Sequence, residues 1–181
     1  LPPDYMVRVT GGHGIHGEPA QYLGEKEVRE FLESVKGKVE GIAISSFMSV
    51  RNPEHEIRVR DMAREILGVP AVCGFELSSE LGFNERTTTC VMNARLIPVM
   101  DELIRSVRTV LDERGVKAPL MISRGDGSMM KDSFARERPV ETILSGPAAS
   151  LMGAMAMTGL KDAVVMDMGG TTTDIGILRN G

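Results

Sequence analysis

The stretch VVMDMGGTTTDIGI, from Val164 to Ile177, decides the fold of the C-terminal part of this chain. Apolar runs on either side of a Gly-Gly pair predict two strands, Ala163 to Met168 and Thr173 to Leu178, joined by a tight turn. Asp167 lies near the end of the first strand, and Asp174 begins the second. The stretch therefore predicts a hairpin with a carboxylate on each strand beside a glycine turn.

This hairpin has the composition of a phosphate-binding turn. Glycine has no Cβ, so phosphate can approach the backbone N–H groups at Gly169 and Gly170. Threonine hydroxyls add donors, and Mg²⁺ prefers carboxylate oxygens and keeps much of its water. The candidate phosphate ligands are Asp167, Gly169, Gly170, Thr171, Thr172, Thr173 and Asp174, of which Asp167 and Asp174 are the candidate metal ligands. The alternative is a plain turn in which the glycines only reverse the chain.

Two other nucleotide-binding motifs are disfavoured. A strand, not a helix, is expected after the glycines, which argues against a dinucleotide-binding fingerprint. The Gly-Lys-Ser/Thr ending of a P-loop is absent from the hairpin. A further candidate anion site is Ser145-Gly146-Pro147, which begins a helix expected to reach Thr158, because the first N–H groups of a helix are unpaired. An ordinary helix start is the alternative there.

Composition limits the class of protein. The chain has 181 residues, of which 42% are hydrophobic and 25% charged, and a formal net charge of −4. The mixed charges predict no nucleic-acid partner, and no apolar run approaches the ~18 residues of a membrane span. Cys73 and Cys90 are expected to be buried free thiols, and a cytoplasmic location is the default. Because the chain begins without Met and stops just after the hairpin, we expect an internal piece of a longer protein.

Upstream of the hairpin, the pattern predicts a sheet covered by helices, followed by one long helix. Pro98 is expected to kink or divide that long helix. The expected strands are Tyr5–Thr10, Gly41–Phe47, Val69–Phe75 and Leu120–Ser123, and the expected helices are Glu25–Val35, Asn52–Gly68 and Asn84–Arg114.

Several polar residues have weaker interpretations. His13 and His16 are expected in a surface loop, and His55 is expected to cap a helix or pair at its surface. Arg86, with Thr87 to Thr89, either faces a cleft or caps the long helix, and the sequence leaves both open. The turn from Gly125 to Ser128 is expected to be a plain turn, with a substrate or nucleotide loop as the alternative.

Four motifs in this order resemble the hydantoinase A/oxoprolinase family. They are RNPEHE (Arg51 to Glu56), ERTTT (Glu85 to Thr89), RPVETILSGPAAS (Arg138 to Ser150) and DMGGTTTDI (Asp167 to Ile175). The last also resembles the phosphate hairpin of actin-like and sugar-kinase ATPases. The chain departs at Gly125-Asp126-Gly127-Ser128, where many members have Ser-Asp-Gly-Gly, which bears on the substrate subgroup.

The resemblance implies an α/β fold of incomplete ribonuclease-H-like (actin-like ATPase) lobes, with a mixed sheet flanked by helices. Residues 1–80 would end a first lobe, and residues 81–181 would supply a connecting helix and the start of a second. It further implies ATP and Mg²⁺ as cofactors, a small cyclic amide or ketone as substrate, and a second large subunit of hydantoinase B type.

The implied activity is ATP-dependent hydrolysis of a cyclic amide, such as a hydantoin or 5-oxoproline, through phosphorylation of its carbonyl oxygen. The alternatives are a ketone carboxylase subunit, a kinase, or a non-catalytic nucleotide-binding protein of the same fold. The 181-residue chain alone carries a single phosphate hairpin and is expected to be inactive.

Overall fold

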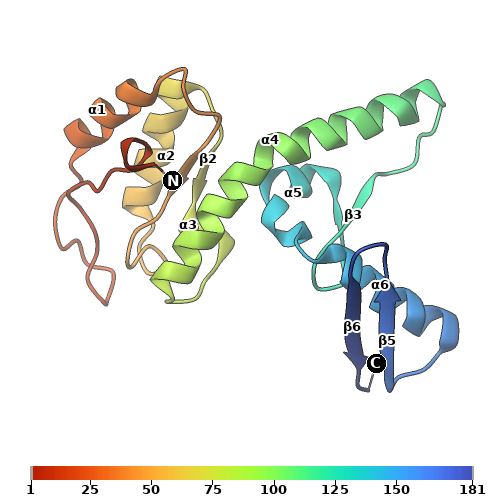
Figure 1. The fold of residues 1–181 in the computed structure, drawn as a ribbon. Helices are drawn as coiled ribbons and strands as arrows, with labels where there is room; N and C mark the ends of the chain where they lie inside the picture. The colour runs from red at the N-terminus through yellow and green to blue at the C-terminus, as the bar shows by residue number, and fades with distance from the viewer. Residues whose placement is uncertain (1, 181) are drawn as a thin grey trace. The chain divides into compact units, whose positions relative to one another are not determined.

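The computed structural model describes residues 2–180, which form two compact units, Leu1–Val99 and Met100–Gly181. Figure 1 shows the order of the elements within each unit. No helix within the described range is long and apolar enough to cross a membrane. The two units are treated separately below.

The first unit packs two helices onto a small parallel sheet. Helices α1 (Glu25–Val35) and α2 (Glu54–Leu67) alternate with strands β1 (Ile42–Ile44) and β2 (Ala71–Cys73), which pair in parallel. Apolar side chains of all four elements form one core, which includes Leu32, Ile44, Met62, Ala63 and Cys73. The short helix α3 (Gly74–Leu77) follows β2, and a 3₁₀ turn, η1 (Pro3–Tyr5), lies near the N-terminus.

Three expected strands of this unit differ from the structure. The segment Tyr5–Thr10 is not a strand, because no strand of the described residues pairs with it; the Thr10 N–H donates instead to Glu27 Oε2 at 2.7 Å. The expected strand Gly41–Phe47 is reduced to β1. The expected strand Val69–Phe75 ends at Cys73, because a capping box between Cys73 and Glu76 begins α3 there.

Helix α4 (Phe83–Glu113) is the long helix expected from the sequence. It runs through Pro98, so the proline does not divide it, although a proline removes one intrahelical hydrogen bond. The boundary between the two compact units falls next to this proline, between Val99 and Met100. Asn52 lies just before α2, where its Oδ1 accepts the Glu54 N–H at 3.0 Å, and Gly68 ends that helix in the left-handed conformation.

The second unit contains two antiparallel hairpins and a helix. The first hairpin pairs β3 (Met121–Ser123) with β4 (Met129–Lys131) and leads into α5 (Asp132–Glu137) and the 3₁₀ turn η2 (Pro139–Thr142). Met100, Ile104, Met130 and Ala135 form its core. Helix α6 (Ser145–Thr158) then precedes β5 (Ala163–Met168) and β6 (Thr173–Leu178). The described residues thus form three two-stranded sheets, not the mixed sheet that was expected.

Candidate functional site

Strands β5 and β6 form the predicted hairpin, with the predicted bounds. They pair antiparallel from Ala163 opposite Leu178 to Met168 opposite Thr173. The Gly169 N–H donates to the Thr172 carbonyl at 2.9 Å and closes the turn. Asp167 and Asp174 therefore lie one pair back from the turn that joins β5 and β6 in Figure 1.

The glycines in this turn are not required by the backbone. Neither Gly169 nor Gly170 has a positive φ, so the chain reversal uses a conformation open to other residues. A Cβ placed on Gly170 would meet no atom within 4 Å, and one on Gly169 would meet only the Thr172 carbonyl oxygen, at 3.4 Å. The plain-turn interpretation therefore gives no reason for two glycines here, whereas an approaching ligand does.

Asp167 and Asp174 lie directly opposite each other across the two strands. Like charges in this position repel each other, and both residues are exposed. Neither forms an ion pair with any residue from 2 to 180. Within residues 2–180 the only hydrogen-bond partner of these two carboxylates is Ser150 of α6, whose Oγ donates to Asp167 Oδ2 at 2.5 Å. The pair thus leaves a concentration of negative charge that the described chain does not neutralise.

Helix α6 and the hairpin enclose a small pocket of about 170 Å³ around these carboxylates. Helix α6 approaches closely because Gly176 has no side chain: a Cβ there would lie 2.4 Å from Leu151 Cδ2. The lining residues are Leu144, Pro147, Ser150 and Leu151 from the helix region, and Val165, Asp167, Asp174, Ile175 and Gly176 from the strands. The structure therefore brings the start of α6 and the aspartates together.

The other predicted ligands are near this pocket but do not line it. Ser145 and Gly146 form the first residues of α6, after Leu144 in the left-handed conformation. Thr171, Thr172 and Thr173 are exposed, and their hydroxyls make no hydrogen bond within the described part of the chain. Sequence reasoning missed Ser150 as a partner of Asp167, because 17 residues separate the two and only the packing of α6 joins them.

The residues at this pocket suit a hydrated Mg²⁺ ion carrying phosphate. Both candidate metal ligands, Asp167 and Asp174, offer carboxylate oxygen atoms, which this hard ion prefers. Residues 2–180 contain no cluster of three or more His, Cys, Asp or Glu side chains that could hold a metal. Two carboxylates alone would leave most coordination positions to water and phosphate, which is the usual arrangement for Mg²⁺ with a nucleotide.

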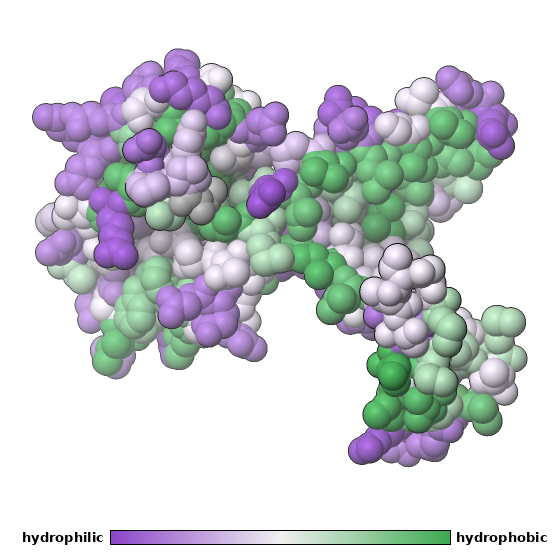
Figure 2. All heavy atoms as spheres, in the orientation of Figure 1, coloured by the Kyte–Doolittle hydropathy of each residue, from purple (hydrophilic) through white to green (hydrophobic). Residues whose placement is uncertain are grey.

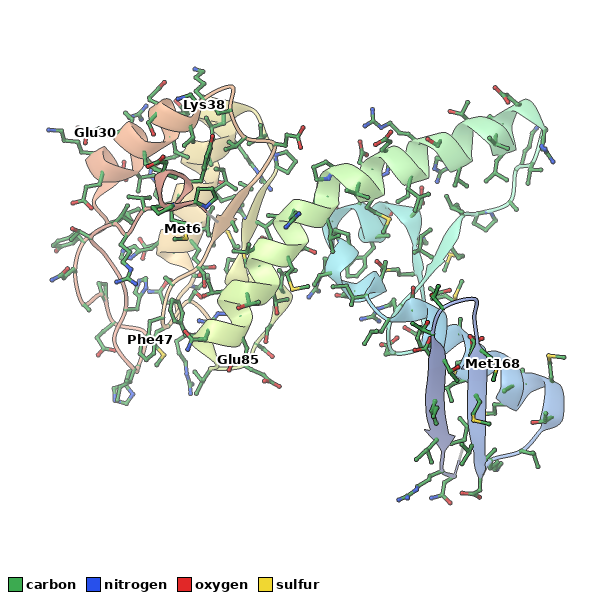
Figure 3. All side chains as sticks on the ribbon, viewed as in Figure 1. Met6, Glu30, Lys38, Phe47, Glu85 and Met168 are labelled. Atoms are coloured by element: carbon green, nitrogen blue, oxygen red, sulfur yellow. The ribbon has the colours of Figure 1, made fainter. Side chains whose placement is uncertain are left out.

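The hairpin buries one face only. The side chains that point away from α6 are large and apolar, and their exposed fractions lie between 62% and 76%: Val164, Met166, Met168, Ile175 and Ile177. Figure 2 shows the green apolar surface over β5 and β6, and Figure 3 labels Met168. The candidate pocket lies on the opposite, helix-covered face.

The motif residues of the first unit are buried and bound to backbone. Arg86 is 1% exposed, and its guanidinium donates to the carbonyls of Glu80, Ser46 and Phe47 at 2.7 to 2.9 Å. Glu56 is equally buried and accepts the N–H groups of Ser46 and Phe75. Arg86 therefore holds the loops that follow β1 and precede α4, so that in this unit it neither faces a cleft nor caps α4, the two roles that the sequence left open.

The histidines differ from expectation. His13 is buried, not on the surface, because its ring packs against His55 with centroids 4.2 Å apart. His55 does not cap α2; its Nδ1 accepts the Gly12 N–H at 3.0 Å and so ties the glycine-rich loop to the helix. Burial, with the neighbouring His13, lowers the pKa of His55. His16 is exposed, as expected.

Both cysteines are buried and free, as predicted. The Cys90 thiol lies within hydrogen-bond distance of the Ile44 and Val72 carbonyls. Desolvation by burial raises the pKa of Cys90 to about 12 and raises that of Cys73 further. Neither thiol is therefore a nucleophile near neutral pH.

Two family models match the chain. The hydantoinase/oxoprolinase model covers residues 86–181, and the model of the hydantoinase/oxoprolinase N-terminal region covers residues 1–67. The chain belongs to the hydantoinase/oxoprolinase family. The resemblance found in the four sequence motifs is thereby confirmed.

The relatives include enzymes that act on different carbonyl compounds. Caprolactamase subunit alpha from Pseudomonas jessenii is 33% identical, over 100% of this chain and 27% of its own length. The acetophenone carboxylase gamma subunit from Aromatoleum aromaticum is 34% identical, over 97% of this chain and 25% of its own. The chain thus spans about a quarter of the length of these curated relatives.

Solved structures agree with the fold. The crystal structure of the ATP-dependent caprolactamase from Pseudomonas jessenii matches 93% of this chain and 25% of its own, with a TM-score of 0.84 and 31% identity. A nucleotide-free acetone carboxylase matches 95% of this chain with a TM-score of 0.77, and at 23% identity that match speaks for the fold alone. The α/β arrangement described here is therefore that of ATP-dependent members of the family.

Proposed function

We propose that this chain is a segment of a longer ATP-dependent enzyme that hydrolyses a cyclic amide, and that the β5–β6 hairpin binds the phosphates and Mg²⁺ of ATP. The observation that carries the proposal is the opposed pair Asp167 and Asp174, which no cation of the described chain neutralises. A bound divalent ion would remove their repulsion. The glycines that the turn itself does not require support the same conclusion.

Each group at the site has an assigned role. Asp167 and Asp174 would hold Mg²⁺ directly or through water, and a bound ion would supply positive charge beside the phosphates. The exposed N–H groups at Gly169 and Gly170 and the hydroxyls of Thr171, Thr172 and Thr173 donate to phosphate oxygens. The amides at Ser145 and Gly146, at the open end of α6, are placed to add to the anion-binding surface.

The reaction uses ATP to activate a carbonyl. The amide oxygen attacks the γ-phosphorus, the bond to ADP breaks, and an O-phosphorylated imidate forms. Water then adds to the carbon, the ring C–N bond breaks with the amine leaving protonated, and a second water hydrolyses the resulting acyl phosphate to carboxylate and phosphate. The hairpin contributes to the first step, by positioning phosphate and stabilising charge.

The whole enzyme would place this hairpin between two ribonuclease-H-like lobes, with residues 1–80 from one and residues 81–181 from the connection and the other. Several relatives carry the word subunit in their names, as in caprolactamase subunit alpha and the acetone carboxylase beta subunit from Xanthobacter autotrophicus. We therefore propose that the enzyme works with a second large subunit of hydantoinase B type.

A ketone carboxylase subunit is the second candidate, since the acetophenone carboxylase gamma subunit is as similar to this chain as caprolactamase subunit alpha. The two functions share the phosphorylation step and differ in what attacks next. The sequence departure at Gly125 to Ser128 does not distinguish them, because the bonds of that turn are structural: Asp126 Oδ1 accepts the N–H and the Oγ–H of Ser128, and the Gly125 N–H donates to the Glu141 carbonyl.

The test is phosphate release by the full-length protein with its partner subunit, Mg²⁺ and ATP. Lactams, hydantoins and 5-oxoproline are compared with ketones plus bicarbonate. Stimulation by one cyclic amide, with an amino acid as product, supports the proposal. Stimulation by a ketone only if bicarbonate is present identifies the carboxylase instead. If the product is a stable phosphorylated compound, the protein is a kinase.

A further inference from the structure

We propose that Ser150 is a positioning residue for the metal site: it holds Asp167 in the rotamer that faces Asp174 and the pocket. The inference rests on the proposed function, because it assigns a role relative to the Asp167–Asp174 metal site. It adds a residue that none of the sequence motifs identified as a ligand. The juxtaposition arises from the packing of α6 onto β5 and β6.

The geometry separates the two aspartates. Ser150 Oγ donates to Asp167 Oδ2 at 2.5 Å, whereas the Asp174 carboxylate accepts no hydrogen bond within residues 2–180. One oxygen of Asp167 is thus held by the helix, and its Oδ1 remains for a ligand. A carboxylate held by a second hydrogen bond loses less rotamer entropy when it binds a metal, which is how outer partners of metal ligands usually act.

A close contact beside the Ser150–Asp167 hydrogen bond sets the distance between α6 and the hairpin. Leu151, the neighbour of Ser150, lies against Gly176, where a Cβ would approach three Leu151 atoms at 2.4, 2.7 and 2.8 Å. Gly176 is two residues along β6 from Asp174, on the same face. The absence of a side chain at Gly176 therefore allows Ser150 to reach Asp167, and these three residues all line the pocket.

A purely structural role for Ser150 predicts something different. Ser150 is half-buried, and its hydroxyl could simply join the helix to the hairpin. In that case its loss would lower the stability of the second unit and leave metal binding unchanged. A positioning role predicts the reverse pattern.

The experiment compares Ser150→Ala, Ser150→Thr and Asp174→Asn in the full-length protein. Thr158→Ala serves as the control, because Thr158 is in the same helix and its hydroxyl donates to the Ala154 carbonyl, away from the pocket. Calorimetry gives the dissociation constant for Mn²⁺ mixed with a non-hydrolysable ATP analogue. Steady-state kinetics gives the Mg²⁺ concentration for half-maximal turnover, and thermal unfolding reports stability.

We expect Ser150→Ala to weaken binding of the Mn²⁺ complex about tenfold and to raise the half-maximal Mg²⁺ concentration by a similar factor. Ser150→Thr, which keeps the hydroxyl, should bind within about threefold of wild type, and Thr158→Ala should not differ from it. The unfolding midpoint of Ser150→Ala should be unaltered. Wild-type binding by Ser150→Ala, with weakened binding by Asp174→Asn, overturns the role of Ser150 and leaves the metal site in place. Wild-type binding by both variants overturns the metal site and this inference together.

Discussion

The two units use their motif residues in opposite ways. In the first, Glu56 and Arg86 are 1% exposed and bind only backbone groups. In the second, Asp167 and Asp174 are exposed and lie opposite each other. Of the two carboxylates, only that of Asp167 accepts a hydrogen bond from the described chain, and its donor is Ser150. Buried charged residues that bind backbone carbonyl and N–H groups stabilise the fold, whereas opposed carboxylates without a neutralising cation are candidates for ligand binding. Similarity of motif alone does not make this distinction; burial and partners do.

Arg86→Met tests the structural role of the buried motif residues, and we expect it to have the largest effect on stability. The substitution removes the charged donor of three part-buried hydrogen bonds to the carbonyls of Ser46, Phe47 and Glu80, and a hydrogen bond to a charged group contributes about 1.5–3 kcal/mol. We expect the first unit to lose about 3 kcal/mol or more, measured by hydrogen exchange of the β1 and β2 amides. Arg95→Met is the matched control, since Arg95 is exposed on the same helix. Equal protection in the two variants would refute the structural role.

Asp174→Ala tests the functional role of the exposed aspartates. Loss of a metal contact that stabilises transferring phosphate typically lowers turnover by about a hundredfold, or ~2.7 kcal/mol of barrier. We expect this loss of ATP turnover in the full-length enzyme while the unfolding midpoint stays the same, because Asp174 is exposed and lacks an ion pair. Turnover within about threefold of wild type would exclude Asp174 from the site.

The sequence predicted those parts of the structure that depend on local pattern. The hairpin strands, α1 and α6 have the predicted bounds, because apolar periodicity and flanking glycines define them. Strand β4 was missed, since MMK shows no alternation and its pairing with β3 decides its structure. The segment Tyr5–Thr10 has a strand-like composition but no partner strand within the described residues. Composition without a partner does not form a strand.

The candidate site, too, could be predicted only in part. Local sequence identified Asp167, the two turn glycines and Asp174 as candidate ligands. The contact from Ser150 and the close approach at Gly176 were not, because both depend on how α6 packs on the hairpin. The burial of His13 was missed for the same reason, since its partner His55 lies 42 residues away. Long-range packing is the part of the information that a local pattern lacks.

A third prediction compares two glycines within the hairpin. Gly176→Ala should destabilise the second unit by about 1 kcal/mol, because the new methyl overlaps Leu151, which is only half-buried and can move. Gly170→Ala should change stability by less than about 0.5 kcal/mol, since its Cβ meets nothing, yet should lower ATP turnover. Exchange protection of the β5 and β6 amides measures the first effect. Equal destabilisation by both substitutions would show that the turn glycine is structural after all.

The smallest expected effect is a pH dependence in the first unit, centred on His55. Its Nδ1 accepts the Gly12 N–H, and burial with the neighbouring His13 lowers its pKa, while Glu54 opposes the shift. The unfolded chain, with an ordinary histidine pKa near 6.5, therefore binds a proton more readily than the folded one. Stability from this group is intact above about pH 7 and declines as the pH falls below ~6.5, until the folded His55 is also protonated.

His55→Gln, whose amide oxygen can still accept the Gly12 N–H, should flatten this dependence, and His16→Gln, at an exposed ring, should not. Urea unfolding of the 181-residue chain between pH 5 and 8 measures it. An unchanged slope in His55→Gln would mean that the histidine contact does not couple the glycine-rich loop to α2 through protonation.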